Sequence, residues 1–153
     1  MLQIALPNKG ALAEGAVELV REAGYHCRRA GRALTVRDVE NEVNFLFLRP
    51  RDIAVYVSNG VLDLGITGRD MLIDSRTDLE ELLPLRFGKA RFVYAVPRAS
   101  TLVPEAFGGL RVATSYVHLV AKDLARRGID AEVVHLDGAV EISIQLGLSL
   151  IHI

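Results

Sequence analysis

Short, mostly apolar runs alternate along this chain with longer segments of helical periodicity. Residues 2–6 form the first apolar run and end at a proline, which predicts a short buried strand. Between residues 12 and 23, apolar positions recur every three to four residues, so we expect a helix that ends at Gly24. Residues 33–40 and 43–48 predict two strands, and their short connection favours an antiparallel pair.

The same rhythm continues through the rest of the chain. The predicted elements are a helix at 52–59 followed by Gly60, a strand at 62–67, a short helix at 69–74, two extended stretches within 85–97, a strand at 110–115, a helix at 116–127 followed by Gly128, a strand at 131–136 and a further helix opening at 137. Strands that alternate with helices indicate an α/β protein with a largely parallel sheet.

The prolines and glycines of residues 97–109 indicate a boundary between two lobes. We therefore expect a first α/β lobe over 1–96 and a partial second lobe over 97–148. After Gly147 the sequence stops in the middle of a βα unit, and residues 149–153 end it as an apolar stub. We expect these last five residues to be a tail foreign to the parent protein.

Composition excludes several classes of partner. With 18 basic and 19 acidic residues among 153, the net charge of −1 gives no general attraction for nucleic acid or for an anionic membrane. No apolar run approaches the roughly 18 residues that would cross a bilayer, and the first residues lack the pattern of a signal peptide. Cys27 is the only cysteine, so no intrachain disulfide can form and a cytoplasmic location is expected.

Basic and glycine-containing turns follow the predicted strands of the first lobe. In open α/β sheets, ligands bind where strands end and helices begin, because the first N–H groups of those helices attract anions. Lys9 and Arg49 each follow a strand, and the stretch GITGRD places Gly68 and Asp70 at the start of another helix. The alternatives are a solvated turn lysine, a glycine that only shapes a turn and an aspartate that only favours the first helical turn.

The second lobe offers hydroxyls at one predicted helix start. Thr114 and Ser115 can cap that helix or help to hold an anion. Glu141 would complete a capping box only if Gly138 is the cap. The histidines lack zinc spacing, and the chain has neither a nucleophile elbow nor a glycine-rich phosphate loop. The pattern therefore predicts a two-lobed α/β protein that binds a small anion. A basic cluster also stands at Arg28, Arg29 and Arg32, of which we expect no more than one or two residues to touch a ligand.

Five stretches, read together, resemble one enzyme family. They are IALPNKGAL (4–12), FLRPRDIAVYV (47–57), LDLGITGRD (62–70), RVATSY (111–116) and GIDAEVVHLDGAVE (128–141). They resemble ATP phosphoribosyltransferase, the first enzyme of histidine biosynthesis, in its long, actinobacterial-type form. The resemblance implies a fold like the type II periplasmic binding proteins, with two α/β lobes, of which the second is incomplete here.

The resemblance also implies the reaction. Adenine N1 of ATP attacks the anomeric carbon of phosphoribosyl pyrophosphate, and pyrophosphate leaves. N1 carries a free lone pair, so the chemistry calls for Mg²⁺, arginine and N–H groups rather than a base. Mg²⁺ arrives with phosphoribosyl pyrophosphate, and no metal ligand is assigned to the chain. By this resemblance Arg49 and Arg32 neutralise pyrophosphate. The substrate-binding residues implied are Lys9, Gly10, Thr67, Gly68, Asp70, Thr114, Ser115, Tyr116 and Glu141.

The sequence departs from the family after residue 147. There the family continues into an acidic E-T-G-x-[ST]-L loop, which holds the 5′-phosphate of the ribosyl donor, and later into a regulatory domain. We therefore expect little or no turnover from this chain, and a parent that forms a homo-oligomer, either a dimer or a hexamer. The alternatives are a small-anion-binding module of the periplasmic-binding-protein type without catalysis, and a noncatalytic fragment that only associates with partners.

Overall fold

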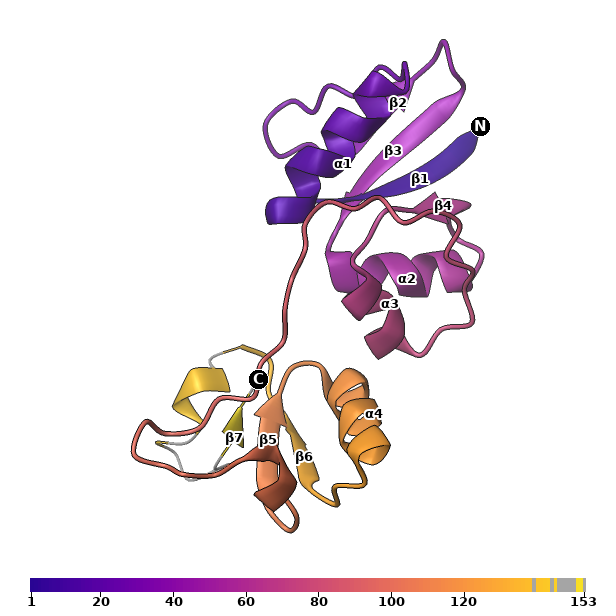
Figure 1. Ribbon diagram of the computed structural model, residues 1–153. Helices are drawn as coiled ribbons and strands as arrows, with labels where there is room; N and C mark the ends of the chain where they lie inside the picture. The colour runs from indigo at the N-terminus through magenta and orange to yellow at the C-terminus, as the bar shows by residue number, and fades with distance from the viewer. Residues whose placement is uncertain (139, 144, 146–150, 153) are drawn as a thin grey trace. The chain divides into compact units, whose positions relative to one another are not determined.

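The computed structural model describes residues 1–138, 140–143, 145 and 151–152 (Figure 1). The chain divides into two compact units, Met1–Lys89 and Ala90–Ile153, and each is of mixed α/β type. The division precedes the proline- and glycine-rich stretch that the sequence indicated as a boundary. In the described part of the chain, no helix has the length and apolar character needed to cross a membrane.

The first unit is built on one mostly parallel sheet. Its strands are β1 (Leu2–Pro7), β2 (Thr35–Asp38), β3 (Val43–Leu48) and β4 (Leu64–Gly65), in the order β2-β3-β1-β4. The central strand β1 is parallel to both β3 and β4, and β2 pairs with β3 in the antiparallel sense that the sequence predicted. The predicted strand at 62–67 is shorter in the structure, where only two of its residues form β4.

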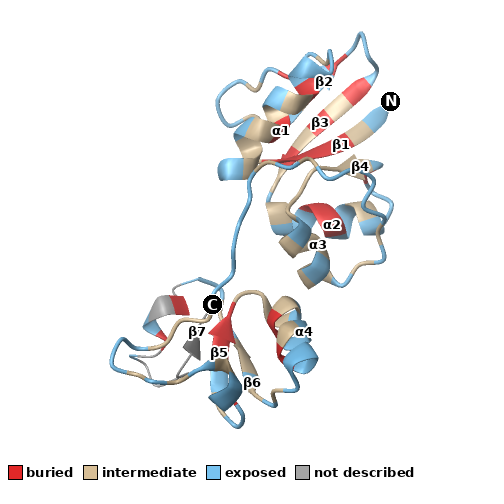
Figure 2. Cartoon of the chain, viewed as in Figure 1, coloured by how far each residue is buried: buried red, intermediate tan, exposed pale blue. Residues whose placement is uncertain are grey.

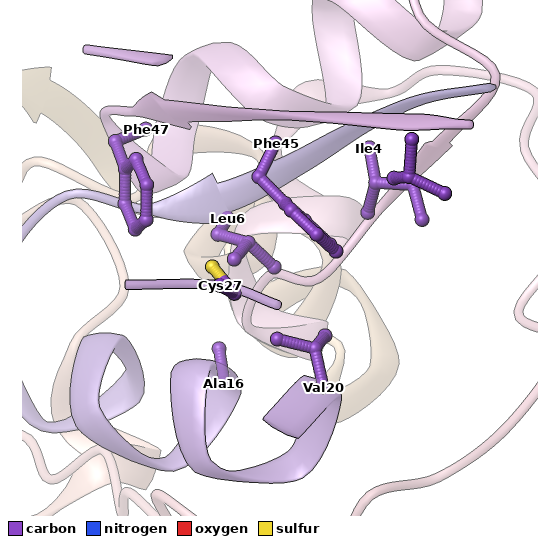
Figure 3. Close-up of a cluster of buried hydrophobic side chains, with 8 residues drawn as sticks. Ile4, Leu6, Ala16, Val20, Cys27, Phe45 and Phe47 are labelled. Carbon is purple, nitrogen blue, oxygen red and sulfur yellow. The ribbon is translucent and has the colours of Figure 1, made fainter. Parts of the chain in front are cut away.

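Helices cover both faces of this sheet. They are α1 (Ala11–Glu22), α2 (Pro50–Ser58) and α3 (Arg69–Ser75). Figure 3 shows Leu6, Phe45 and Phe47 pointing from the sheet toward α1, with Cys27 in the same cluster. Ala5, the neighbour of Leu6 in β1, packs on the other face of the sheet with Ile53 of α2. The alternation of β1 side chains thus builds two cores, one beneath each helical layer.

The second unit has a smaller parallel sheet. Its strands are β5 (Arg111–Thr114), β6 (Glu132–His135) and β7 (Ile151–His152), with β5 between the other two. Helix α4 (Val117–Arg127) packs Val120 and Leu124 against Val112 and Phe107, and these residues form the buried core of the unit. Figure 2 shows buried segments on both β5 and α4. A short 3-10 turn, η1 (Pro104–Ala106), precedes β5.

One helix ending recurs in both units. After α1, Gly24 has φ +95° and the N–H of Tyr25 donates to the carbonyl of Val20. After α4, Gly128 has φ +69° and the N–H of Ile129 donates to the carbonyl of Leu124. These are Schellman endings, in which a left-handed glycine lets the chain turn back over the last helical turn. Both glycine stops predicted from the sequence are therefore present.

Two predicted elements differ in the structure. Residues 85–97 contain no regular strand, although Tyr94 and Val96 pack on the second core. Packing explains their apolar pattern only in part, since Phe92 and Val93 are exposed. The helix expected from residue 137 appears, within the described residues, only as the 3-10 turn η2 (Val140–Ile142). Of the expected foreign tail, Ile151 and His152 form β7, and residues 149, 150 and 153 lie outside the described residues.

A buried carboxylate fixes the turn between β2 and β3. Asp38 accepts hydrogen bonds from the side-chain Nδ2 of Asn41 at 2.8 Å and from the backbone N–H of His26 at 2.6 Å. The hydrogen bond from the Asn41 side chain is the main reason that the pKa of Asp38 lies below its ordinary value. The carboxylate thus stabilises the folded chain in its charged form.

We expect this contribution to depend on pH in a definite direction. Because the folded-state pKa of Asp38 is lowered, the contribution is complete above the ordinary value of about 3.9 and is lost as the pH falls through the folded value. Urea unfolding of the protein and of Asp38→Asn should therefore give midpoints that differ most near neutral pH and converge as the pH approaches the folded-state pKa. The exposed Asp78 supplies the control Asp78→Asn, whose urea midpoint should differ from that of the unmodified protein by the same amount at every pH. If the difference in midpoint between Asp38→Asn and the unmodified protein also stayed constant with pH, the prediction would be contradicted.

Candidate functional site

The carboxyl ends of β1, β3 and β4 meet at one edge of the first sheet. Pro7 lies opposite Leu48 in the parallel register, and the N–H of Asn8 donates to the Leu48 carbonyl at 2.8 Å. On the other side of β1, the N–H of Ile66 donates to the Ala5 carbonyl at 2.9 Å. The loops that follow the three strands therefore start side by side, and we call this edge the strand-end edge.

Three helices begin at the strand-end edge, and none of them has a side-chain cap among the described residues. Their N-cap residues are Gly10 for α1, Arg49 for α2 and Gly68 for α3. The first N–H groups of a helix lack partners within it, and the helix dipole adds partial positive charge there. The longer helices α1 and α2 thus offer N–H groups suited to an anion. Gly10 has φ +80°, a conformation that favours glycine.

A hydrogen bond joins two of these loops. The hydroxyl of Thr67 donates to the carbonyl of Pro50 at 2.8 Å. Pro50 is the first residue of α2, and Arg49 before it is extended at φ −65° and ψ 136°, as is usual before proline. Arg49 is exposed, so its guanidinium is accessible to solvent from a backbone position fixed on both sides.

The two glycines of GITGRD have different roles. A Cβ at Gly65 would lie well inside van der Waals distance of Ile53 and close to Val57, so Gly65 lets β4 pack directly on α2. Gly65 therefore serves packing against a helix and does not stand in a ligand-binding turn. Gly68 has φ −73°, and its missing Cβ leaves space that the Asp70 carboxylate occupies. Close packing, not a left-handed backbone, explains both positions.

The arginine beside Asp70 is occupied by another acid. Arg69 donates from Nε to Glu81 at 2.8 Å and forms a second, shorter bond from its terminal nitrogen. The hydrogen bond from Arg69 lowers the pKa of Glu81, and the same bond raises the pKa of Arg69. This pair fastens the chain that follows α3 to the start of that helix.

Arg29 is the residue of the basic cluster that the structure places most firmly. Its Nε donates to the Ala33 carbonyl at 2.7 Å, its NH1 donates to the Asn8 carbonyl at 3.0 Å, and its guanidinium lies 4.4 Å from the centre of the Phe47 ring. The loop that carries the exposed Arg32 is thereby attached to the loop after β1. No sequence signal distinguished Arg29 from its neighbours, because its partners are distant in the chain.

An open groove of about 370 Å³ runs beside α1 in the first unit. It is lined by Pro7, Ala13, Glu14, Val17, Glu18, Arg21, Arg29 and Phe47. Of the residues that the sequence suggested as ligand contacts, it contains only Arg29 of the basic cluster. Because Pro7 ends β1 and Arg29 donates to the Asn8 carbonyl, the groove adjoins the strand-end edge.

In the second unit, β5 and β6 also end side by side. Thr114 is fully buried, and its hydroxyl accepts the N–H of Tyr116 at 2.9 Å, in the turn just before α4. The N–H of Leu136 donates to the Thr114 carbonyl at 3.0 Å, which joins the loop after β6 to the turn that contains Ser115. Tyr116 meets Phe92 edge to face, with ring centres 4.8 Å apart. Glu141 lies in η2, beyond the loop after β6.

Comparison with known proteins gives the family. The family model described as HisG, ATP phosphoribosyltransferase, matches residues 49–151, which is more than half of the chain. The chain belongs to the ATP phosphoribosyltransferase family. An ATP phosphoribosyltransferase of Salinibacter ruber is 63% identical over 150 residues, and one of Rhodococcus erythropolis is 56% identical over 149. Each alignment covers 97% of this chain and 53% of the relative, so the chain spans about half the length of these relatives.

A solved structure agrees with this assignment. The ATP phosphoribosyl transferase (HisG:HisZ) complex from Thermotoga maritima contains a chain that is 27% identical to this one, with a TM-score of 0.77. The match covers 99% of this chain and 72% of that chain. This ATP phosphoribosyltransferase-family chain therefore has the mixed α/β fold of its family.

Among the residues described for this family member, no group of three or more His, Cys, Asp or Glu side chains could hold a metal ion. The predicted site residues fall into two sets. Lys9, Gly10, Arg49, Thr67, Gly68 and Asp70 lie in the loops and first helical turns at the strand-end edge, and the loop that carries Arg32 is attached there through Arg29. In the second unit, Thr114 ends β5, Ser115 and Tyr116 lie between β5 and α4, and Glu141 lies in η2.

A polar cluster attaches the segment before η1 to α4 in this chain. Asp123 accepts from the Tyr94 hydroxyl at 3.0 Å, from Arg126 at 2.6 Å and from Arg127 at 2.7 Å. Desolvation alone would raise the pKa of Asp123, but the hydrogen bonds from Arg127, Arg126 and Tyr94 lower it further than burial raises it. Burial, followed by the bond to Asp123, raises the pKa of Tyr94 to about 12.

We expect Tyr94→Phe to lower the free energy of unfolding by about 1–1.5 kcal/mol, because a hydrogen bond to a partly exposed carboxylate is lost while the ring contact with Phe107 remains. Chemical denaturation followed by circular dichroism would measure the change. Tyr56→Phe is the control, since that tyrosine is exposed on α2. Equal unfolding midpoints for Tyr94→Phe and the unmodified chain would show that the bond adds no stability.

Proposed function

We propose that this chain carries substrate-binding surfaces of an ATP phosphoribosyltransferase that acts in the cytoplasm. The observation that supports the proposal most directly is the strand-end edge, where the uncapped starts of α1 and α2 lie beside Lys9 and Arg49. Both substrates of the reaction, ATP and phosphoribosyl pyrophosphate, are polyanions. An edge with free N–H groups, a lysine and an arginine matches that charge.

The proposed reaction transfers the phosphoribosyl group to N1 of ATP. The N1 lone pair forms a bond to the anomeric carbon as the bond from that carbon to pyrophosphate breaks, so no side chain has to remove a proton from the nucleophile. Negative charge accumulates on the departing pyrophosphate, which Mg²⁺ accompanies as part of the substrate. Arg49 and Arg32 would neutralise this charge, and Lys9 would contact a phosphate.

The remaining predicted residues would orient the substrates. Gly10, Thr67, Gly68 and Asp70 would line the first unit's part of the site, with Asp70 accepting from a sugar hydroxyl or an amine. Thr114, Ser115, Tyr116 and Glu141 would line the second unit's part. We propose that the two units correspond to the lobes of a type II periplasmic-binding-protein-like fold, and that the parent protein is a homo-oligomer.

Binding and turnover test the proposal separately. Isothermal titration with Mg²⁺ and either ATP or phosphoribosyl pyrophosphate should show weak but saturable binding to the chain. Formation of phosphoribosyl-ATP should be absent or far below that of the full-length Salinibacter ruber relative under the same conditions. If neither substrate bound, the assignment of the strand-end edge would be contradicted. Turnover equal to that of the full-length relative would contradict the expectation of inactivity.

A further inference from the structure

The side chain of Asn8 contains a buried atom that the fold leaves without a partner. Within the described part of the chain, its Oδ1 accepts no hydrogen bond, although this oxygen is shielded from solvent. Buried polar side-chain atoms are hydrogen-bonded in the large majority of cases, because an unpaired acceptor loses its bonds to water and gains nothing in return. Such an exception at the strand-end edge calls for a partner from outside the chain.

The backbone of Asn8 is held from both sides, so the side chain starts from a fixed position. Its N–H donates to the Leu48 carbonyl at 2.8 Å, and its carbonyl accepts from NH1 of Arg29 at 3.0 Å. These bonds tie Asn8 to the end of β3 and to the arginine that packs on Phe47. An outside partner can therefore meet this oxygen only after rotation of the side chain of Asn8, a residue that is itself partly exposed, since a backbone shift would break two hydrogen bonds.

The neighbours of Asn8 indicate which kind of group could donate to this oxygen. Lys9 directly follows Asn8 in the chain. Arg49 directly follows Leu48, whose carbonyl accepts the N–H of Asn8. Both cations suit phosphate, but phosphate oxygens are acceptors and cannot satisfy another acceptor. The donors closest to the phosphates in ATP and in phosphoribosyl pyrophosphate are ribose hydroxyls. In the second compound, one hydroxyl is on the carbon next to the one that bears pyrophosphate.

We propose that Asn8 Oδ1 accepts a hydrogen bond from a ribose hydroxyl of the substrate whose phosphates lie near Lys9 and Arg49. Asn8 is then a substrate-positioning residue that is left unsatisfied in the free protein. The inference rests on the proposed function, since it takes its ligand from that reaction. It predicts an unusual combination, in which removing the oxygen weakens binding without weakening the fold.

The test compares Asn8→Leu, which keeps the side-chain volume but removes the acceptor, with the unmodified 153-residue chain. The melting temperature of the ligand-free protein should be unchanged or higher, because replacing an unsatisfied buried polar group by an apolar one is neutral or stabilising. Affinity for one substrate, measured by titration with Mg²⁺, should fall about tenfold. Asn8→Ala provides a second variant if leucine does not fit, and Asn59→Leu, at the exposed C-terminal end of α2, is the matched control.

The choice of ligand identifies the source of the hydroxyl. If Asn8 contacts ATP, 2′-deoxy-ATP or 3′-deoxy-ATP should bind the unmodified chain about tenfold more weakly than ATP, and Asn8→Leu should not distinguish them. If it contacts phosphoribosyl pyrophosphate, only the titration with that substrate should change.

Wild-type affinity of both Asn8 variants for both substrates would overturn this inference but not the proposed function. A clear drop in the melting temperature of both Asn8 variants would also overturn it, since the oxygen would then be satisfied in the free protein, for example by water. No binding of either substrate to the unmodified chain would overturn the proposed function and this inference together.

Discussion

Replacing Gly65 by valine is expected to lower the free energy of unfolding of the first unit by about 3 kcal/mol or more. The added Cβ would overlap the Ile53 side chain and crowd Val57, and on the same side it would contact Ala5. Ile53 and Ala5 are almost completely buried, so neither can move aside into solvent. The structure must then either separate β4 from α2 or shift β4 out of its register with β1.

Hydrogen exchange read by mass spectrometry would locate this effect. Peptides from α2 and β4 should lose protection in Gly65→Val, while peptides from α4 in the second unit keep theirs. The control Gly108→Val adds the same side chain where no atom lies within 4 Å of the new Cβ, and it should change little. Unchanged protection of α2 in Gly65→Val would show that the helix can move away from the strand at little cost.

Replacing Arg49 by alanine is expected to reduce the affinity for phosphoribosyl pyrophosphate by about 10- to 100-fold. A charge-assisted hydrogen bond contributes about 1.5–3 kcal/mol, and 1.4 kcal/mol corresponds to a factor of ten. Arg49→Lys should recover part of the loss, because it restores the charge but not the two-pronged contact with phosphate oxygens. Since Arg49 is exposed, the melting temperature should change little.

Arg51 supplies a matched control for this experiment. It lies two residues away in the first turn of α2 and is paired with Asp74 at 3.4 Å. Arg51→Ala removes the same charge from the same helix without touching the proposed phosphate contact, so affinity should fall less than threefold by loss of long-range attraction. Equal losses in the two variants would mean that general charge, and not the position of Arg49, governs binding.

The sequence predicted those parts of the fold that depend on local pattern. The strand at β1, the antiparallel β2-β3 pair and the helix stops at Gly24 and Gly128 are all specified by nearby residues. For residues 85–97 the sequence indicated only extended backbone, and no regular strand forms there. A strand needs a neighbour with free backbone groups, and apolar alternation cannot show whether one is present.

The candidate site was predictable only in part, for the same reason. Lys9 and Arg49 could be placed at strand ends from their positions after apolar runs. The packing role of Gly65 depends on Ile53, and the anchoring role of Arg29 depends on Phe47 and Asn8, so neither follows from adjacent residues. The unpaired oxygen of Asn8 is likewise a property of the assembled edge and has no signature in the turn PNKG.

The hydrogen bond from Thr67 to Pro50 has a mechanical consequence. It couples a two-residue strand, which by itself has little to hold it, to the much better anchored start of α2. Any displacement of α2 that follows capture of a phosphate would therefore be transmitted to the turn before α3. The turn before α3 and the start of α2 would thus move together, although they share no backbone pairing.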